Sequence, residues 1–129
     1  MIKKLISLAA FLGLIAIVLG AFGAHGLKKV LTEMQLESFE TGVKYQMYHA
    51  LFLLVVASLP ILTEKQKRSI GIIATTGVFL FSGSIYLLAT QDLTKTDFSF
   101  LGPVTPIGGV FLIAAWCMTA VYALKQKTN

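Results

Sequence analysis

Four long apolar runs divide the chain. They cover residues 5–24, 45–62, 70–90 and 107–124, and none of them contains Asp, Glu, Lys or Arg. A helix needs about 20 apolar residues to cross the hydrocarbon core of a bilayer, so each run is about long enough to span a membrane. The pattern predicts an all-α fold, a four-helix transmembrane bundle in which residues 1–129 form a single integral membrane domain. The first run exceeds the about 7–15 apolar residues of a secretory signal, so we expect it to be retained as a span.

The segment between the first two runs has a helical pattern of its own. Apolar residues recur there at helical spacing, at Leu27, Val30, Leu31 and Met34. Thr32 followed by Gln35 is a capping-box pattern, which marks the start of a helix. Two structures fit. One is a short amphipathic helix at the headgroup level that breaks near residues 41–42, and the other is an extension of the second span that begins at Glu33.

Small residues form a stripe along the first run. They recur at spacings of three and four, at Ala9, Gly13, Ala16, Gly20, and Gly23 or Ala24. Helices in lipid associate by close contact, which small residues permit. We therefore expect this stripe to pack tightly against a neighbouring helix. A stripe left facing lipid would instead indicate an oligomer.

The last loop, residues 91–105, is polar at first and then aromatic and rich in proline. Phe98 and Phe100 alternate with small residues and are expected to lie in the membrane interface. Thr105 is expected to be the N-cap of the fourth helix, with Pro106 at its first position. Such a helix start could also attract an anion. A plain capped start is the favoured interpretation.

Composition narrows the class of protein. Hydrophobic residues make up 56% of the 129 residues and charged residues only 13%, about half the charged share of a soluble domain. This excludes a soluble enzyme, a nucleic-acid-binding domain and a disordered tail. The one cysteine, Cys117, lies inside an apolar run and cannot form an intramolecular disulfide or a cysteine-based metal site. The net charge of +5 comes from residues that flank the apolar runs, where Lys and Arg meet lipid headgroups.

The distribution of Lys and Arg predicts the orientation. One side of the membrane would carry seven of them: Lys3, Lys4, Lys65, Lys67, Arg68, Lys125 and Lys127. The other side would carry four: Lys28, Lys29, Lys44 and Lys95. The positive-inside rule then predicts a multi-pass protein of the cell membrane with both termini in the cytoplasm.

Polar residues with some chemical capacity fall at one depth near the non-cytoplasmic side. They are His25, Tyr45, Gln46, Tyr48, His49, Ser82, Ser84, Tyr86 and Thr105. One interpretation is that these side chains join the helices by hydrogen bonds, and the other is that they line a cavity for a lipid headgroup, a proton or a metal. The first is favoured because polar contacts between membrane helices are common. Two histidines lack a third strong metal ligand, so we expect no metal. The chain has no glycine-rich phosphate loop, nucleophile elbow or zinc-protease helix, so we expect no catalytic residue and no cofactor.

Four stretches resemble a known family. They are Gly20–Leu27 (GAFGAHGL), Phe39–Leu51 (FETGVKYQMYHAL), Phe81–Tyr86 (FSGSIY) and Gly102–Gly109 (GPVTPIGG). Their order and sequence are similar to the domain of unknown function 423 family, also called the UPF0382 membrane proteins. The resemblance implies a four-span membrane protein without an established activity. It supplies no catalytic residue, and it singles out most of the same polar positions.

Two functions therefore compete. The favoured one is a non-enzymatic membrane protein that supports the membrane or another complex. Its expected partners are membrane lipids and a second copy or another membrane protein, and not nucleic acid. The alternative is a carrier or binding protein for a small molecule, a proton or a lipid, with the polar residues as its site. A carrier needs a cavity with unpaired polar groups, whereas a structural protein needs those groups paired with one another.

Overall fold

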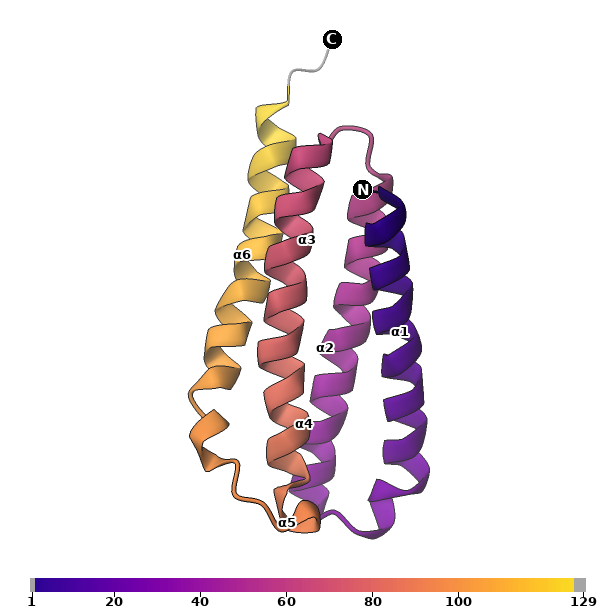
Figure 1. Ribbon diagram of the computed structural model, residues 1–129, viewed down its shortest axis with the longest axis vertical. Coiled ribbons are helices and arrows are strands. Elements are labelled where there is room, and N and C mark those ends of the chain that lie inside the picture. Colours follow the sequence, from indigo (N-terminus) through magenta and orange to yellow (C-terminus); the bar gives the residue numbers. More distant parts are fainter. Residues whose placement is uncertain (1, 127–129) are drawn as a thin grey trace.

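The computed structural model describes residues 2–126, which form long antiparallel helical rods (Figure 1). In chain order the rods are α1 (Ile2–His25), α2 (Glu33–Ser58), a composite rod, and α6 (Val104–Lys125). The composite rod joins α3 (Glu64–Val78), a π-helix η2 (Phe79–Gly83) and α4 (Ser84–Ala89). The described part of the chain contains no strand, so the all-α prediction is confirmed.

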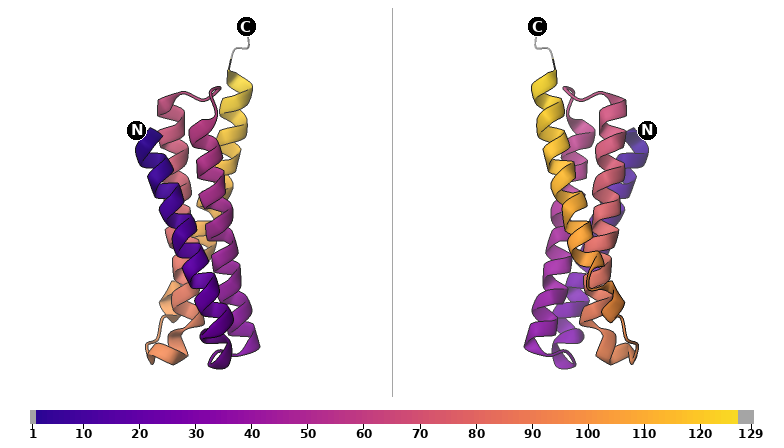
Figure 2. Two further views of the ribbon diagram at one scale, coloured as in Figure 1. Left: turned by 90° about the vertical axis from the view of Figure 1, so that its right-hand side faces the viewer. Right: turned by 90° about the vertical axis from the view of Figure 1, so that its left-hand side faces the viewer.

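The connections alternate between the two ends of the bundle (Figures 1 and 2). The first loop contains the short 3-10 helix η1 (Leu27–Lys29), and the last contains α5 (Gln91–Thr94) and the 3-10 helix η3 (Ser99–Leu101). Both lie at one end. The turn between α2 and α3 lies at the other, together with the two ends of the chain. Of the cations that predict the orientation, Lys127 is outside the described residues.

α2 is one continuous helix, so the predicted break near residues 41–42 is wrong and the alternative is confirmed. The helix begins with the expected capping box, in which the Gln35 backbone N–H donates to Thr32 Oγ1 over 3.1 Å and the Thr32 N–H to Gln35 Oε1 over 3.0 Å. Gly42 continues the helix, and its missing side chain lets α4 pack closely against α2. A Cβ there would lie 2.8 Å from Cε1 of Tyr86.

The small-residue stripe of α1 packs against α2, as predicted. Ala9 and Ala16 are buried. A Cβ added at Gly13 would meet Ala50, and one added at Gly20 would meet Val43. Because the stripe is used inside the chain, it is not a surface on which a second copy could pack.

α6 begins earlier than predicted. Pro103 is its N-cap and Val104 its first residue, so Thr105 is not the N-cap and Pro106 is not the first helical position. The difference is allowed because the first turn of a helix has no intrahelical use for its N–H groups, so a proline costs little there. Of the two loop aromatics, Phe98 is half-buried, whereas Phe100 is exposed.

Three segments are long and apolar enough to cross a membrane: Ile2–Lys29, Glu64–Ala89 and Ser99–Lys125. They correspond to the first, third and fourth predicted spans. α2 is not among them, and its composition gives the reason. Its first half carries Glu33, Glu37, Glu40 and Lys44, and the next turns carry polar residues that include Gln46 and His49.

Candidate functional site

The predicted polar residues do not form one cluster. Six of them make hydrogen bonds that join different rods, in three separate groups: Gln46, His49, Ser82, Ser84, Tyr86 and Thr105. The side chains of the other three, His25, Tyr45 and Tyr48, are exposed.

The first group joins α1, α2 and the composite rod. The buried Gln46 side chain donates from Nε2 to the Leu12 carbonyl oxygen over 2.8 Å, and its Oε1 accepts from the Tyr86 hydroxyl over 2.7 Å. Nearby, the Ser82 hydroxyl donates to the Gly42 carbonyl oxygen over 2.7 Å. Both hydroxyls and the amide are therefore paired inside the bundle, where an unpaired polar group would be costly.

The second group joins α2 to α6 through His49 and Trp116. The indole Nε1–H of Trp116 donates to His49 Nε2 over 3.0 Å, and His49 Nδ1 lies 2.7 Å from the Tyr45 carbonyl oxygen. A neutral imidazole satisfies both contacts when Nδ1 carries the proton. Both ring nitrogens are then occupied. The indole also packs on Phe52, with ring centroids 4.4 Å apart.

The third group joins the composite rod to α6 at the end that carries the first and last loops. The hydroxyls of Ser84 and Thr105 are hydrogen-bonded to each other. Ser84 Oγ also donates to the Phe81 carbonyl oxygen over 3.0 Å, so the Thr105 hydroxyl is the donor of the pair. Thr105 thus ties α6 to its neighbour instead of capping it.

The His25 side chain is not in any of the three groups. His25 is the last residue of α1 and is exposed, whereas Gly23 is buried in the same turn. Tyr45 and Tyr48 also lie on the outer surface of α2, with ring centroids 5.6 Å apart. Tyr45 enters the network only through its backbone carbonyl.

Sequence reasoning missed Trp116. It is the one tryptophan of the chain, in the middle of an apolar run, and an indole N–H held in an apolar environment usually finds an acceptor. The need of the Trp116 indole for an acceptor was the signal in the sequence that could have identified this residue. The partner was hidden because α2 begins at Glu33, which places His49 about 24 Å along the helix at 1.5 Å per residue and level with the middle of α6.

Two surface grooves adjoin the His49–Trp116 pair. One, of about 780 Å³, runs between α2 and α6 and is lined mainly by apolar residues such as Phe52, Val55 and Leu59. The other, of about 450 Å³, lies on the side of Phe81 and Ile113. The walls of both grooves are mostly hydrocarbon, because the polar atoms of His49 and Trp116 are bonded to each other. The predicted residues Tyr45 and Tyr48 also line the larger groove, and Tyr45 lines the smaller one. Among the described residues, no three His, Cys, Asp or Glu side chains are grouped so that they could hold a metal ion.

The chain matches the protein family described as "Protein of unknown function (DUF423)" over residues 19–109. The chain belongs to this family. That range contains the four motifs that suggested the resemblance, and it contains most of the hydrogen-bonded side chains of the three groups.

Several bacterial relatives are similar over almost their whole length. The UPF0382 membrane protein YwdK of Bacillus subtilis is 44% identical over 95% of this chain and 98% of its own. The UPF0382 inner membrane protein YgdD of Escherichia coli is 36% identical over 92% of this chain and 88% of its own. A UPF0382 membrane protein of Haemophilus influenzae is 34% identical over 98% of both chains. No solved structure matches the chain. The family and the apolar helices together identify a small membrane protein.

Proposed function

We propose that this chain is a four-span protein of the cell membrane that acts without catalysis, as a structural support for the membrane or for another membrane protein. The observation that carries the proposal is the pairing of the interior polar side chains. Gln46, Tyr86, Ser82 and His49 are bonded within the chain, and none of them offers a free polar atom to a substrate.

The connectivity supports α2 as the fourth span. α1 ends at the opposite end of the bundle from the start of α3. If both are spans, the chain between them must cross the membrane again, and α2 is the element that makes this crossing. Its polar side chains Gln46 and His49 are buried against neighbouring rods and so do not face lipid.

The charges support cytoplasmic termini. The end of the bundle that carries the chain ends and the α2–α3 turn holds six of the described cations: Lys3, Lys4, Lys65, Lys67, Arg68 and Lys125. The loops at the other end hold fewer. Lys and Arg favour the cytoplasmic side of short loops, which places this end in the cytoplasm.

A second candidate function is a carrier or binding protein that uses His49. The groove of about 780 Å³ beside the His49–Trp116 pair favours it, because the groove could take an apolar molecule that opens the pair. This candidate differs from the first in one respect. It requires His49 to exchange its bond with Trp116 for one to a ligand or a proton.

Reconstituted liposomes distinguish the two. Purified protein is placed in liposomes that contain a pH-sensitive dye, and a pH step is applied across the membrane. The structural proposal predicts no proton flux above that of empty liposomes. It also predicts that His49→Ala lowers the midpoint of thermal unfolding, because the Trp116 indole loses its acceptor. A flux that disappears in a His49→Ala variant of unchanged stability would favour the carrier and contradict the proposal.

A further inference from the structure

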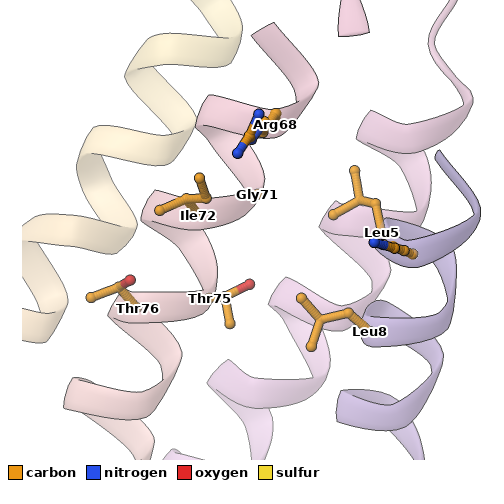
Figure 3. Close-up of a pocket in the computed structure, with 8 residues that line it drawn as sticks. Leu5, Leu8, Arg68, Gly71, Ile72, Thr75 and Thr76 are labelled. Atoms are coloured by element: carbon orange, nitrogen blue, oxygen red, sulfur yellow. The ribbon is translucent and has the colours of Figure 1, made fainter. Parts of the chain in front are cut away.

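A groove of about 440 Å³ opens on the outer surface between α1 and α3 (Figure 3). α1 packs along α2 and meets α3 at few positions, so the two helices are not sealed against each other. The groove lies near the end of the bundle that carries the chain ends. It is separate from the His49–Trp116 pair, and none of the interior hydrogen-bonded groups lines it.

Two cations from distant parts of the sequence line this groove. Lys4 comes from the first turn of α1 and Arg68 from the second turn of α3. Both side chains are exposed. Lys4 and Arg68 therefore bring two positive charges to one groove. A basic pocket between membrane helices on the cytoplasmic side is typical of anionic headgroup binding.

Toward the middle of the membrane the lining is mostly apolar, with Thr75 and Thr76 at its inner end. Leu5 and Leu8 line one side, and Ile72 lines the other. Arg68 and Ile72 are one turn apart on α3, so a molecule that contacts the guanidinium can lay a hydrocarbon chain along the apolar walls. The helices come closest at Gly71, where a Cβ would lie 2.9 Å from Cδ1 of Leu5.

An unpaired hydroxyl also lines this groove. Thr75 Oγ1 is the one buried side-chain polar atom of residues 2–126 that has no hydrogen-bond partner. Figure 3 shows it on the side of α3 that faces Leu5 and Leu8. A buried hydroxyl without a partner is costly.

We propose that this groove binds one anionic phospholipid of the leaflet that surrounds the chain ends. Lys4 and Arg68 contact the phosphate group, and an acyl chain lies against Leu5, Leu8 and Ile72. Charge complementarity selects the anionic headgroup, and the apolar walls select a lipid rather than a soluble phosphate. This site does not depend on the function of His49.

Native mass spectrometry tests the proposal on the full-length protein in detergent. Phosphatidylglycerol, phosphatidylcholine and glycerol phosphate are added in separate titrations. We expect one tightly bound phosphatidylglycerol, weaker phosphatidylcholine and no retained glycerol phosphate. In the double variant Lys4→Gln with Arg68→Gln, the affinity for phosphatidylglycerol should fall about 25-fold, since each Lys or Arg near an anionic headgroup contributes about fivefold.

A matched double variant controls for the loss of charge. Lys3→Gln with Lys65→Gln removes the same net charge from neighbouring exposed positions that do not line the groove. It should retain the affinity of the unmodified protein to within about threefold, because its charges lie farther from the site. An equal loss in both double variants would overturn the specific site. Equal binding of phosphatidylglycerol and phosphatidylcholine by the unmodified protein would overturn it as well.

A substitution inside the groove tests the acyl-chain part separately. Ile72 is exposed, so Ile72→Trp can fill the groove without disturbing the core. It should weaken phosphatidylglycerol binding, whereas Ile17→Trp on the exposed face of α1 outside the groove should not. Unchanged phosphatidylglycerol binding by the Ile72→Trp variant would contradict the placement of the acyl chain against Ile72.

Discussion

Single glycines set how closely the rods approach. The tightest case is Gly108 of α6, where a Cβ would collide with the backbone nitrogen of Phe81 and lie 2.7 Å from the carbonyl carbon of Leu80. These are backbone atoms of η2 and cannot rotate away. Gly109, the next residue, has only ordinary contacts, with Cδ1 of Phe81 at 3.7 Å.

Gly108→Ala should therefore destabilise the protein while Gly109→Ala should not. Forcing an extra methyl group into a close backbone contact costs about 1–3 kcal/mol or more. Gly109→Ala is neutral or slightly stabilising because alanine favours the helix. Thermal unfolding of both variants in the same detergent measures the difference. Equal midpoints for the two variants would show that the Gly108 contact is not as close as described.

Residue-level predictions from the sequence succeeded where the chemistry is local. Thr32 and Gln35 form the expected capping box because both partners lie within one turn. His49 was singled out by its polarity, but its partner Trp116 could not be found, because that pairing depends on how α2 and α6 align. The side chain of His25 was included for its depth alone, and depth does not decide which face of a helix is buried.

Among the helices, α3 caps the C-terminal end of α2 through a lysine side chain. Lys67 is buried, and its Nζ donates to the Ala57 carbonyl oxygen in the last turn of α2 over 2.9 Å. A cation there satisfies a carbonyl that the helix leaves unpaired and complements the helix dipole. Lys65, two residues earlier, is exposed.

Lys67→Met should lower the stability of the bundle, by about 1–3 kcal/mol for the loss of a buried hydrogen bond from a charged group. Lys65→Met removes the same charge from an exposed position and should change stability by less than about 0.5 kcal/mol. Chemical denaturation in mixed micelles, followed by circular dichroism, compares the two. Similar losses for both variants would mean that charge alone matters and that the bond to Ala57 contributes nothing.

Element boundaries were predictable to the extent that they depend on apolar runs and caps. The sequence left two interpretations of the second helix, a start at Glu33 or a break near residues 41–42. A glycine at position 42 can either break a helix or allow a neighbouring helix to pack closely. The π-helix at Phe79–Gly83 has no signal in the sequence. It lies where Gly108 brings the backbone of α6 against Phe81, a contact between distant parts of the chain.

For the whole molecule, the sequence predicted an antiparallel helical bundle because apolar runs separated by short loops leave few other arrangements in a membrane. The sequence did not predict which polar side chains of each helix face the interior of the bundle. The structure places six of the predicted polar side chains in three bonded groups and leaves apolar residues such as Phe11, Ile17 and Val110 exposed along α1 and α6. Such exposed apolar side chains suit helices that contact lipid.

We propose that α2 crosses the membrane and that both chain ends lie in the cytoplasm, and cysteine labelling tests this most directly. Cys117 is the one cysteine of the chain, so Cys117→Ser gives a background free of thiols. Single cysteines are then introduced into the Cys117→Ser variant at exposed loop positions: Val30→Cys, Ile61→Cys and Thr96→Cys. Intact cells are treated with a membrane-impermeant maleimide before and after permeabilisation.

We predict that Val30→Cys and Thr96→Cys are labelled in intact cells and that Ile61→Cys is labelled only after permeabilisation. Labelling of Val30→Cys and Ile61→Cys from the same side would show that α2 does not cross, and this would contradict the four-span account. The reverse pattern, with only Ile61→Cys labelled in intact cells, would contradict the cytoplasmic placement of the chain ends.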